Sequence, residues 1–88
     1  MFNKEINIKN LEFTHFVVAN LEKIIFASAR EGQRLRNFIL DPEGRWAKYQ
    51  VNGHFEYLPK ELAWEVTRSA QKYYGRVPIY RTKTLSFN

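Results

Sequence analysis

Few side chains in this sequence could carry out a reaction. His54 and Glu56 alternate along one predicted strand, so their side chains share a face. A histidine beside a carboxylate is the minimum for acid–base catalysis, but on a hairpin strand such a pair is usually just solvated. No further residues in the sequence complete an active site around this pair. We therefore expect the protein not to be an enzyme.

Cofactor and metal motifs are also missing from the sequence. There is no cysteine, which excludes disulfides, thiol catalysis and cysteine-based zinc sites. His15 lies in an apolar segment and is expected to pack in the core, and two separate histidines make no metal cluster. The turn at 41–44 lacks the oxygen spacing of a calcium loop, and the four glycines form no phosphate-binding motif. We expect no cofactor and no metal.

The charge of the chain is segregated along its length. The formal net charge is +5, yet residues 1–65 carry nine basic and nine acidic residues. Residues 66–88 contain five basic residues and no acid, so the whole excess lies in the last quarter of the chain. Segregated charge creates a directed field that attracts anionic partners such as nucleic acid. The alternative is that these cations protect a sheet edge from pairing with another chain.

Both tryptophans lie on faces that the pattern predicts to be polar. Trp64 shares a predicted helix face with Arg68 and Lys72, and Trp46 shares a strand face with Lys48. An exposed tryptophan flanked by cations can stack on a nucleobase while the cations hold phosphate. The alternative is that the chain termini cover both tryptophans.

Residues 76–88 predict a basic C-terminal strand or tail. Tyr80 falls on the polar side of this strand, whereas Arg81 and Lys83 fall on its apolar side. Either the strand leaves the sheet in its middle or a bulge shifts its register, and both place these side chains in solvent. The candidate nucleic-acid-binding residues are therefore Trp46, Lys48, Trp64, Arg68, Lys72, Arg76, Tyr80, Arg81 and Lys83.

The elements that position these residues are clearest in the middle of the chain, where residues 34–58 predict a three-stranded meander. A tight turn at 41–44 separates the first two strands, since Pro42 pre-sets φ and Gly44 accepts a positive φ. Asn52-Gly53 separates the last two and is the strongest short hairpin signal. Alternation then divides the middle strand between two faces, with Trp46, Lys48 and Gln50 on one and Ala47, Tyr49 and Val51 on the other.

The first third of the chain fits more than one pattern. Residues 11–19 are rich in aromatic and β-branched residues and predict a strand. Asn20 suits the N-cap of a following helix, so we predict a helix over 21–31. One continuous helix over 11–31, or a strand at 23–30, would also fit.

The remaining signals define the fold class. Pro59 ends the meander and opens a predicted helix over 60–74. The 88 residues then form a single α+β domain, with a polar lead-in at 1–10 and the element order β-α-β-β-β-α-β. We expect one antiparallel sheet with both helices on one face.

The composition favours a cytoplasmic protein that does not enter a membrane. It has no cysteine, its N-terminus is polar and unlike a signal peptide, and its apolar runs are too short to span a bilayer. We expect a protein that binds nucleic acid, with RNA or a single strand favoured. It carries no signature of sequence-specific binding.

The alternative function is that of a small inhibitor or adaptor that binds a protein, such as a nuclease or another nucleic-acid-processing enzyme. Exposed tryptophan, tyrosine and arginine are also the residues that dominate binding at protein interfaces. In general style the chain is similar to the small proteins that bacteriophages direct against host enzymes, and to antitoxins, although it shares no motif with them.

Overall fold

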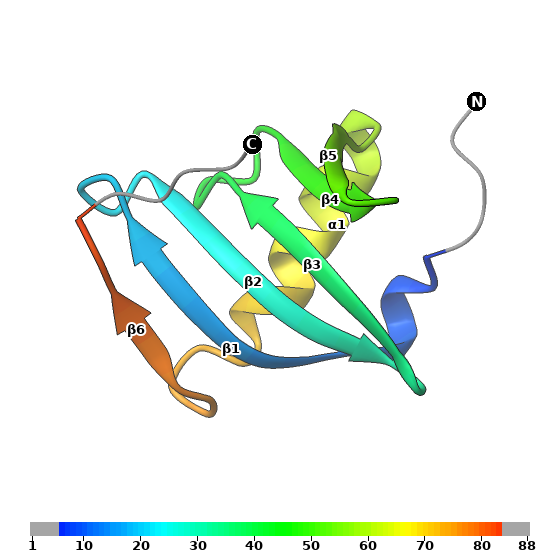
Figure 1. Ribbon diagram of the computed structural model, residues 1–88, viewed down its shortest axis with the longest axis horizontal. Helices are drawn as coiled ribbons and strands as arrows, with labels where there is room; N and C mark the ends of the chain where they lie inside the picture. Colours follow the sequence, from blue (N-terminus) through cyan, green and yellow to red (C-terminus); the bar gives the residue numbers. More distant parts are fainter. Residues whose placement is uncertain (1–5, 84–88) are drawn as a thin grey trace.

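The computed structural model describes residues 6–83, and within them the chain forms a mixed sheet of six strands, one α-helix and one short 3-10 helix (Figure 1). The sheet has the strand order β5-β4-β3-β2-β1-β6. Residues 1–5 of the predicted lead-in and 84–88 of the predicted C-terminal strand lie outside the described residues. In chain order the elements are η1 (Ile8–Asn10), β1 (Leu11–Ala19), β2 (Ile24–Glu31), β3 (Arg34–Leu40), β4 (Ala47–Val51), β5 (His54–Tyr57), α1 (Lys60–Gln71) and β6 (Ile79–Arg81).

The predicted helix over 21–31 is wrong, because the chain forms strand β2 there. Asn20, Leu21 and Glu22 have φ angles of 54°, 59° and 66° and make the turn between β1 and β2. In β2, Ile25 and Ala27 are buried against the helix-covered side of the sheet, as strand alternation requires. The alternative strand at 23–30 is therefore confirmed, and the described residues contain one α-helix instead of the expected two.

The three-stranded meander is confirmed and extends further than predicted, since β1 to β5 pair antiparallel in sequence order. Asn52 and Gly53 both have positive φ (50° and 86°), as a tight hairpin turn requires. The two faces of β4 also follow the prediction, because Ala47 and Tyr49 are buried in the core while Lys48 is partly exposed on the other side.

The expectation of a wholly antiparallel sheet is wrong, because β6 runs parallel to β1 at the edge. The chain passes from β5 through α1 and reaches the far edge of the sheet in the direction of β1, as a crossover connection allows (Figure 1). The Phe16 N–H donates to the Pro78 carbonyl at 3.0 Å, and the Thr82 N–H donates to the Val18 carbonyl at 2.9 Å. These two bonds bracket the short strand and fix its register.

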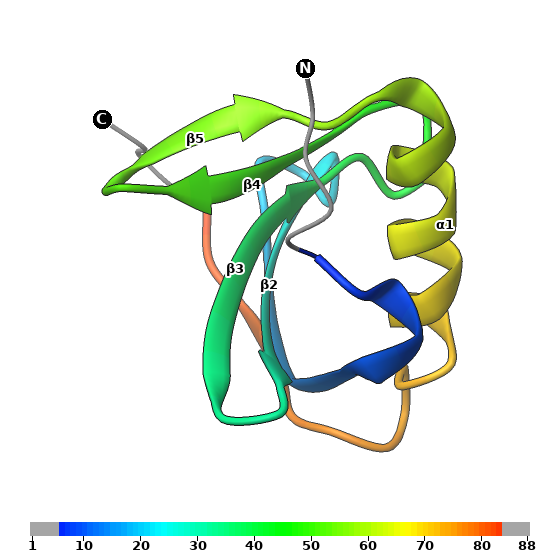
Figure 2. The same ribbon diagram turned by 90° about the vertical axis from the view of Figure 1, so that its right-hand side faces the viewer.

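The predicted helix over 60–74 is confirmed as α1, which ends at Gln71 and continues into turns. It lies across one face of the sheet, and η1 lies beside its C-terminal half (Figure 2). Its inner side is buried, together with aromatic and aliphatic side chains of the strands. The core includes Ala63, Val66 and Ala70 of α1 and Phe13, Phe16, Ala27, Phe38, Leu40 and Tyr49 of the sheet.

No helix of the described residues covers the opposite face of the sheet, which we call the open sheet face (Figure 2). On this side the hairpin of β4 and β5 projects past β2 and β3, away from α1 (Figure 2). No helix in the described part of the chain is long and apolar enough to cross a membrane.

Candidate nucleic-acid interface

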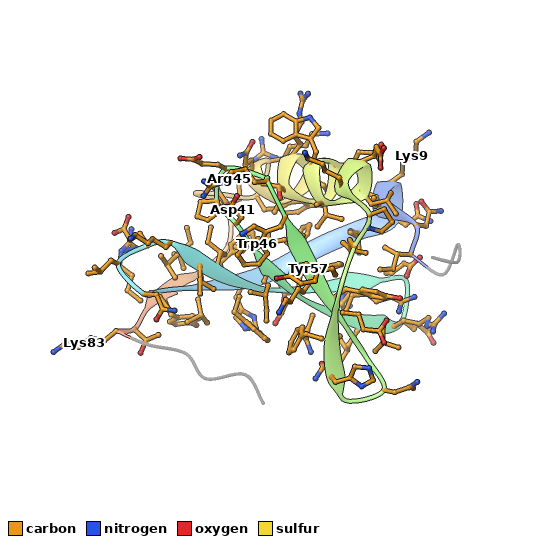
Figure 3. The ribbon with its side chains drawn as sticks, turned by 90° about the horizontal axis from the view of Figure 1, so that it is seen from above. Lys9, Asp41, Arg45, Trp46, Tyr57 and Lys83 are labelled. Atoms are coloured by element: carbon orange, nitrogen blue, oxygen red, sulfur yellow. The ribbon has the colours of Figure 1, made fainter. Side chains whose placement is uncertain are left out.

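A turn closed by Asp41 brings Trp46 to the open sheet face. The Asp41 carboxylate is buried and accepts hydrogen bonds from the Arg45 backbone N–H at 2.8 Å and from its Nε at 2.7 Å (Figure 3). The Asp41 N–H donates to the Trp46 carbonyl at 3.2 Å. Because the guanidinium of Arg45 stabilises the charged carboxylate, the pKa of Asp41 lies below its ordinary value of 3.8, although burial acts in the opposite direction. The turn thus fixes where β4 begins and on which face Trp46 lies.

One row of side chains crosses the open sheet face from edge to edge. Adjacent strands lie about 4.8 Å apart, so five steps across six strands give a row of about 24 Å. Its two ends are exposed tyrosines, Tyr57 at 67% and Tyr80 at 57%. The register places in this row Tyr80, Val17, Phe26, Ile39, Lys48 and Tyr57.

Lys48 and Tyr57 are cross-strand neighbours, and Trp46 lies against the same tyrosine. The Lys48 Nζ is 4.6 Å from the centre of the Tyr57 ring. The Trp46 ring meets that ring edge to face, with centres 6.3 Å apart and planes at 83°. Figure 3 shows Trp46 and Tyr57 close together at the β4–β5 hairpin. The predicted pair of Trp46 and Lys48 therefore shares a face, and the structure adds Tyr57 to it.

A pocket of about 380 Å³ opens beside this cluster. Its walls are mainly aromatic and aliphatic, its charged member is Lys48, and no carboxylate lines it. Its volume lies within the roughly 300–1,000 Å³ range of small-molecule sites, in which apolar walls and few polar groups are usual. The lining residues are Ile24, Ile39, Trp46, Lys48, His54, Phe55 and Tyr57.

The second predicted cluster lies on the outer side of α1 and forms a different site. A groove of about 410 Å³ runs between η1 and α1, and it brings Lys9 to the predicted Trp64, Arg68 and Lys72. We call it the helix-side groove. Glu65 also lines it, so it carries both signs of charge. The groove is completed by Ile8, Leu11, Ser69 and Tyr73.

Trp64 is held by its neighbours, although 49% of it is exposed. A Cβ added at Gly44 would lie 2.5 Å from Cε3 of Trp64, so the ring packs directly on this turn. The guanidinium of Arg68 lies over the ring, with Cζ 5.9 Å from its centre. Packing on the 41–44 turn and contact with Arg68 both restrict how a base could stack on Trp64.

The predicted binding residues near the C-terminus lie apart from both clusters. Tyr80 lies on the open sheet face near His15, with ring centres 6.1 Å apart. Arg81 has the opposite direction and lies 3.6 Å from a carboxylate oxygen of Glu22. Lys83 is exposed at the end of the molecule opposite to Lys9 (Figure 3). Arg76 is exposed in the turns that follow α1.

Of the nine predicted residues, three therefore lie on the open sheet face (Trp46, Lys48 and Tyr80) and three in the helix-side groove (Trp64, Arg68 and Lys72), whereas Arg76, Arg81 and Lys83 join neither site. The charge and face patterns of the sequence do not single out Tyr57 and Phe55, but a signal for them exists. A two-residue hairpin loop fixes the register of β4 and β5, which places Tyr57 opposite Lys48 and Phe55 opposite Gln50. Lys9 gave no such signal, because it reaches the helix-side groove only through the packing of η1 on α1.

The pair of His54 and Glu56 is formed, with 2.8 Å between Nε2 and a carboxylate oxygen. Both side chains are at least half exposed, His54 at 59% and Glu56 at 50%. Within residues 6–83, no three His, Cys, Asp or Glu side chains gather closely enough to hold a metal ion. The expectation that the protein is not an enzyme stays a prediction.

Comparison of the chain with known protein families, with curated proteins and with solved structures gives no significant match.

Proposed function

We propose that this protein binds single-stranded nucleic acid, RNA or DNA, on the open sheet face and without catalysing a reaction. The observation that carries this proposal is the aromatic pocket beside Trp46 and Tyr57, with Lys48 as its cation and no carboxylate in its lining. Antiparallel sheets with exposed aromatic side chains are a common platform for unstacked bases. The hairpin of β4 and β5 supplies the wall against which a base would stack.

Two physical contributions support binding at this face. Stacking of a base on an aromatic ring contributes roughly 1–3 kcal/mol, and Tyr57 is exposed enough to take part. The net charge of +5 attracts a polyanion to the molecule as a whole, and Lys48 lies where it can contact a phosphate next to a stacked base. Tyr80, at the other end of the row, adds a second exposed aromatic ring to the same face.

The helix-side groove is less suited than the open sheet face to binding a nucleic-acid strand. Its tryptophan packs on Gly44 and under Arg68, and Glu65 would repel a phosphate that entered the groove. By contrast, among the residues of β1 to β5, whose antiparallel register assigns each side chain to one face, Glu12 is the one carboxylate on the open sheet face. It is paired with Arg30 at 3.3 Å. A phosphate chain therefore meets less repulsion on the open sheet face.

The proposal is tested by binding of a labelled single-stranded oligonucleotide, measured by fluorescence anisotropy over a range of salt concentrations. A strand with three to five neutralised phosphates gives a slope of log K against log salt of roughly −2 to −3.5. Tyr57→Ala is expected to weaken binding roughly 5- to 100-fold, the equivalent of one lost stacking contact. Lys48→Gln is expected to weaken binding and to make the slope less steep.

Lys72→Gln is the matched control, because it removes the same charge from the helix-side groove. It should reduce affinity less than Lys48→Gln does. Equal losses in the two variants would show that only net charge matters, and absence of binding at low salt would rule the function out.

A second candidate function is the binding of a protein partner, and the helix-side groove favours it. Lys9, Arg68 and Lys72 surround a floor of Leu11 and Tyr73, which suits an acidic segment with apolar side chains. Such a partner fits the alternative of an inhibitor or adaptor acting on a nucleic-acid enzyme. A captured partner that is lost with Arg68→Ala and Lys72→Ala, but kept with Lys48→Gln, would support this function. The reverse pattern would exclude the groove.

A further inference from the structure

Beside the row that runs from Tyr80 to Tyr57, the open sheet face carries three polar side chains on neighbouring strands, which we call the polar row. They are Ser28 on β2, Asn37 on β3 and Gln50 on β4. Ser28 Oγ donates a hydrogen bond to Asn37 Oδ1 at 3.1 Å, and Asn37 Nδ2 donates to Gln50 Oε1 at 2.9 Å. The polar row is thus a hydrogen-bonded chain with one direction.

This direction determines what the polar row can offer to a ligand. Both amide oxygens already accept a hydrogen bond from within the row. The Gln50 Nε2 has no hydrogen-bond partner within residues 6–83, and an amide nitrogen carries two hydrogens. The chain of bonds therefore ends, on β4, in an unused donor.

The unused donor lies next to the pocket. Gln50 is the cross-strand neighbour of Phe55, which lines the pocket. Lys48 precedes it by two residues on the same face, which is about 6.8 Å along an antiparallel strand. A base stacked in the pocket would therefore present its edge to donors from Gln50 and Lys48, with no carboxylate in the lining to accept from it.

We propose that the polar row makes this site select the bases with two carbonyl oxygens, uracil and thymine, over adenine, which has none. The inference rests on the proposed function and names the class of strand that the same site would take. Uracil and thymine present carbonyl oxygens that can accept from the donors at the pocket. Adenine has no carbonyl oxygen, and beside its acceptors N1 and N7 it presents an exocyclic amino group, a donor that would face the same donors and remain unpaired.

Stacking alone predicts the opposite order, which makes the proposal testable. Adenine has the larger ring system, so a site that only stacks bases should bind an adenine strand at least as tightly as a uracil strand. A preference for uracil must come from hydrogen bonds to the base edge.

The test compares short oligouridine and oligoadenosine strands of equal length, each titrated against the protein. We expect the wild-type protein to bind oligouridine more tightly by roughly 2- to 10-fold, the effect of one hydrogen bond. Gln50→Met keeps the length of the side chain and removes the donor, so this ratio should fall to one or below. Oligothymidine should bind as tightly as oligouridine if the protein contacts the base edge and not the ribose.

Gln71→Met is the matched control, because Gln71 is exposed on α1. It should leave the ratio unchanged. If the polar row only holds the β-strands together, Gln50→Met would lower thermal stability and the affinity for both oligonucleotides, and the ratio of the two affinities would not change. That result would overturn the proposal. Equal or tighter binding of oligoadenosine to the wild type would overturn it as well. If neither strand binds, the proposed function itself fails, whereas binding without preference rejects the selection alone.

Discussion

At the scale of single residues, the buried carboxylate of Asp41 holds the turn that positions residues of both candidate sites. Its side chain is 2% exposed and binds both the backbone and the guanidinium of Arg45. The turn that it closes leads into Trp46 on the open sheet face and presents Gly44 to Trp64 on the helix side. Both candidate sites therefore depend on the same carboxylate.

We expect Asp41→Asn to lower the free energy of unfolding at neutral pH by about 1–3 kcal/mol, because a buried hydrogen-bonded charge is lost. The pKa of Asp41 is lowered in the folded state, chiefly by its hydrogen bonds to Arg45, so the unfolded chain takes up the proton first. The stabilisation is complete above the ordinary pKa of 3.8 and is lost as pH falls through the lower folded-state value. Urea unfolding of both proteins over this range checks the prediction.

The matched control for this change is Glu43→Gln, since Glu43 also lies near Arg45, at 3.6 Å, but is 75% exposed. It should change stability little at any pH. A difference between wild type and Asp41→Asn that persisted at the acid end would show that the turn is held by shape and not by the carboxylate charge.

At the scale of elements, β2 shows why a short segment can fit two periodicities. Ile25 and Ala29 are inward in a helix that starts at Asn20, and they are inward in the strand as well. Ala27 separates the two interpretations, because it would lie outside the helical stripe but is fully buried in the strand. The strand is favoured because β1 and β3 bury both of its edges, a contribution that local sequence does not contain.

Ala27→Leu is therefore expected to destabilise the protein by about 1–3 kcal/mol, since Ala27 is fully buried in the core and a larger side chain has no room there. Arg30→Leu, on the exposed side of the same strand, should have a much smaller effect. Thermal unfolding followed by circular dichroism compares the two. Equal tolerance of both changes would contradict the strand assignment.

The candidate site was predictable only as far as the turns fix the register. The meander, the faces of β4 and the pairing of Lys48 with Tyr57 all follow from two short turns whose residues require positive φ. The sequence could not show which of the predicted residues share a surface, because the open sheet face and the helix-side groove are separated by the thickness of the sheet and helix. Local patterning marks Trp46 and Trp64 alike and cannot tell that they lie on opposite sides.

At the scale of the whole molecule, a layer of one helix on a six-stranded sheet leaves one face without a cover among the described residues. That face carries an aromatic pocket, a cation and a hydrogen-bond donor, while much of the unpaired positive charge lies elsewhere. We propose that the dispersed charge attracts a nucleic-acid strand and that the open sheet face holds it.

The measurement that tests this account most directly is the mapping of backbone amide chemical shifts while a single-stranded oligonucleotide is titrated into the labelled protein. We predict that the largest changes fall on β4 and β5, around Lys48, Phe55 and Tyr57, with smaller ones toward Tyr80. Changes concentrated on α1 and around Lys9, or no changes at low salt, would contradict the assignment of binding to the open sheet face.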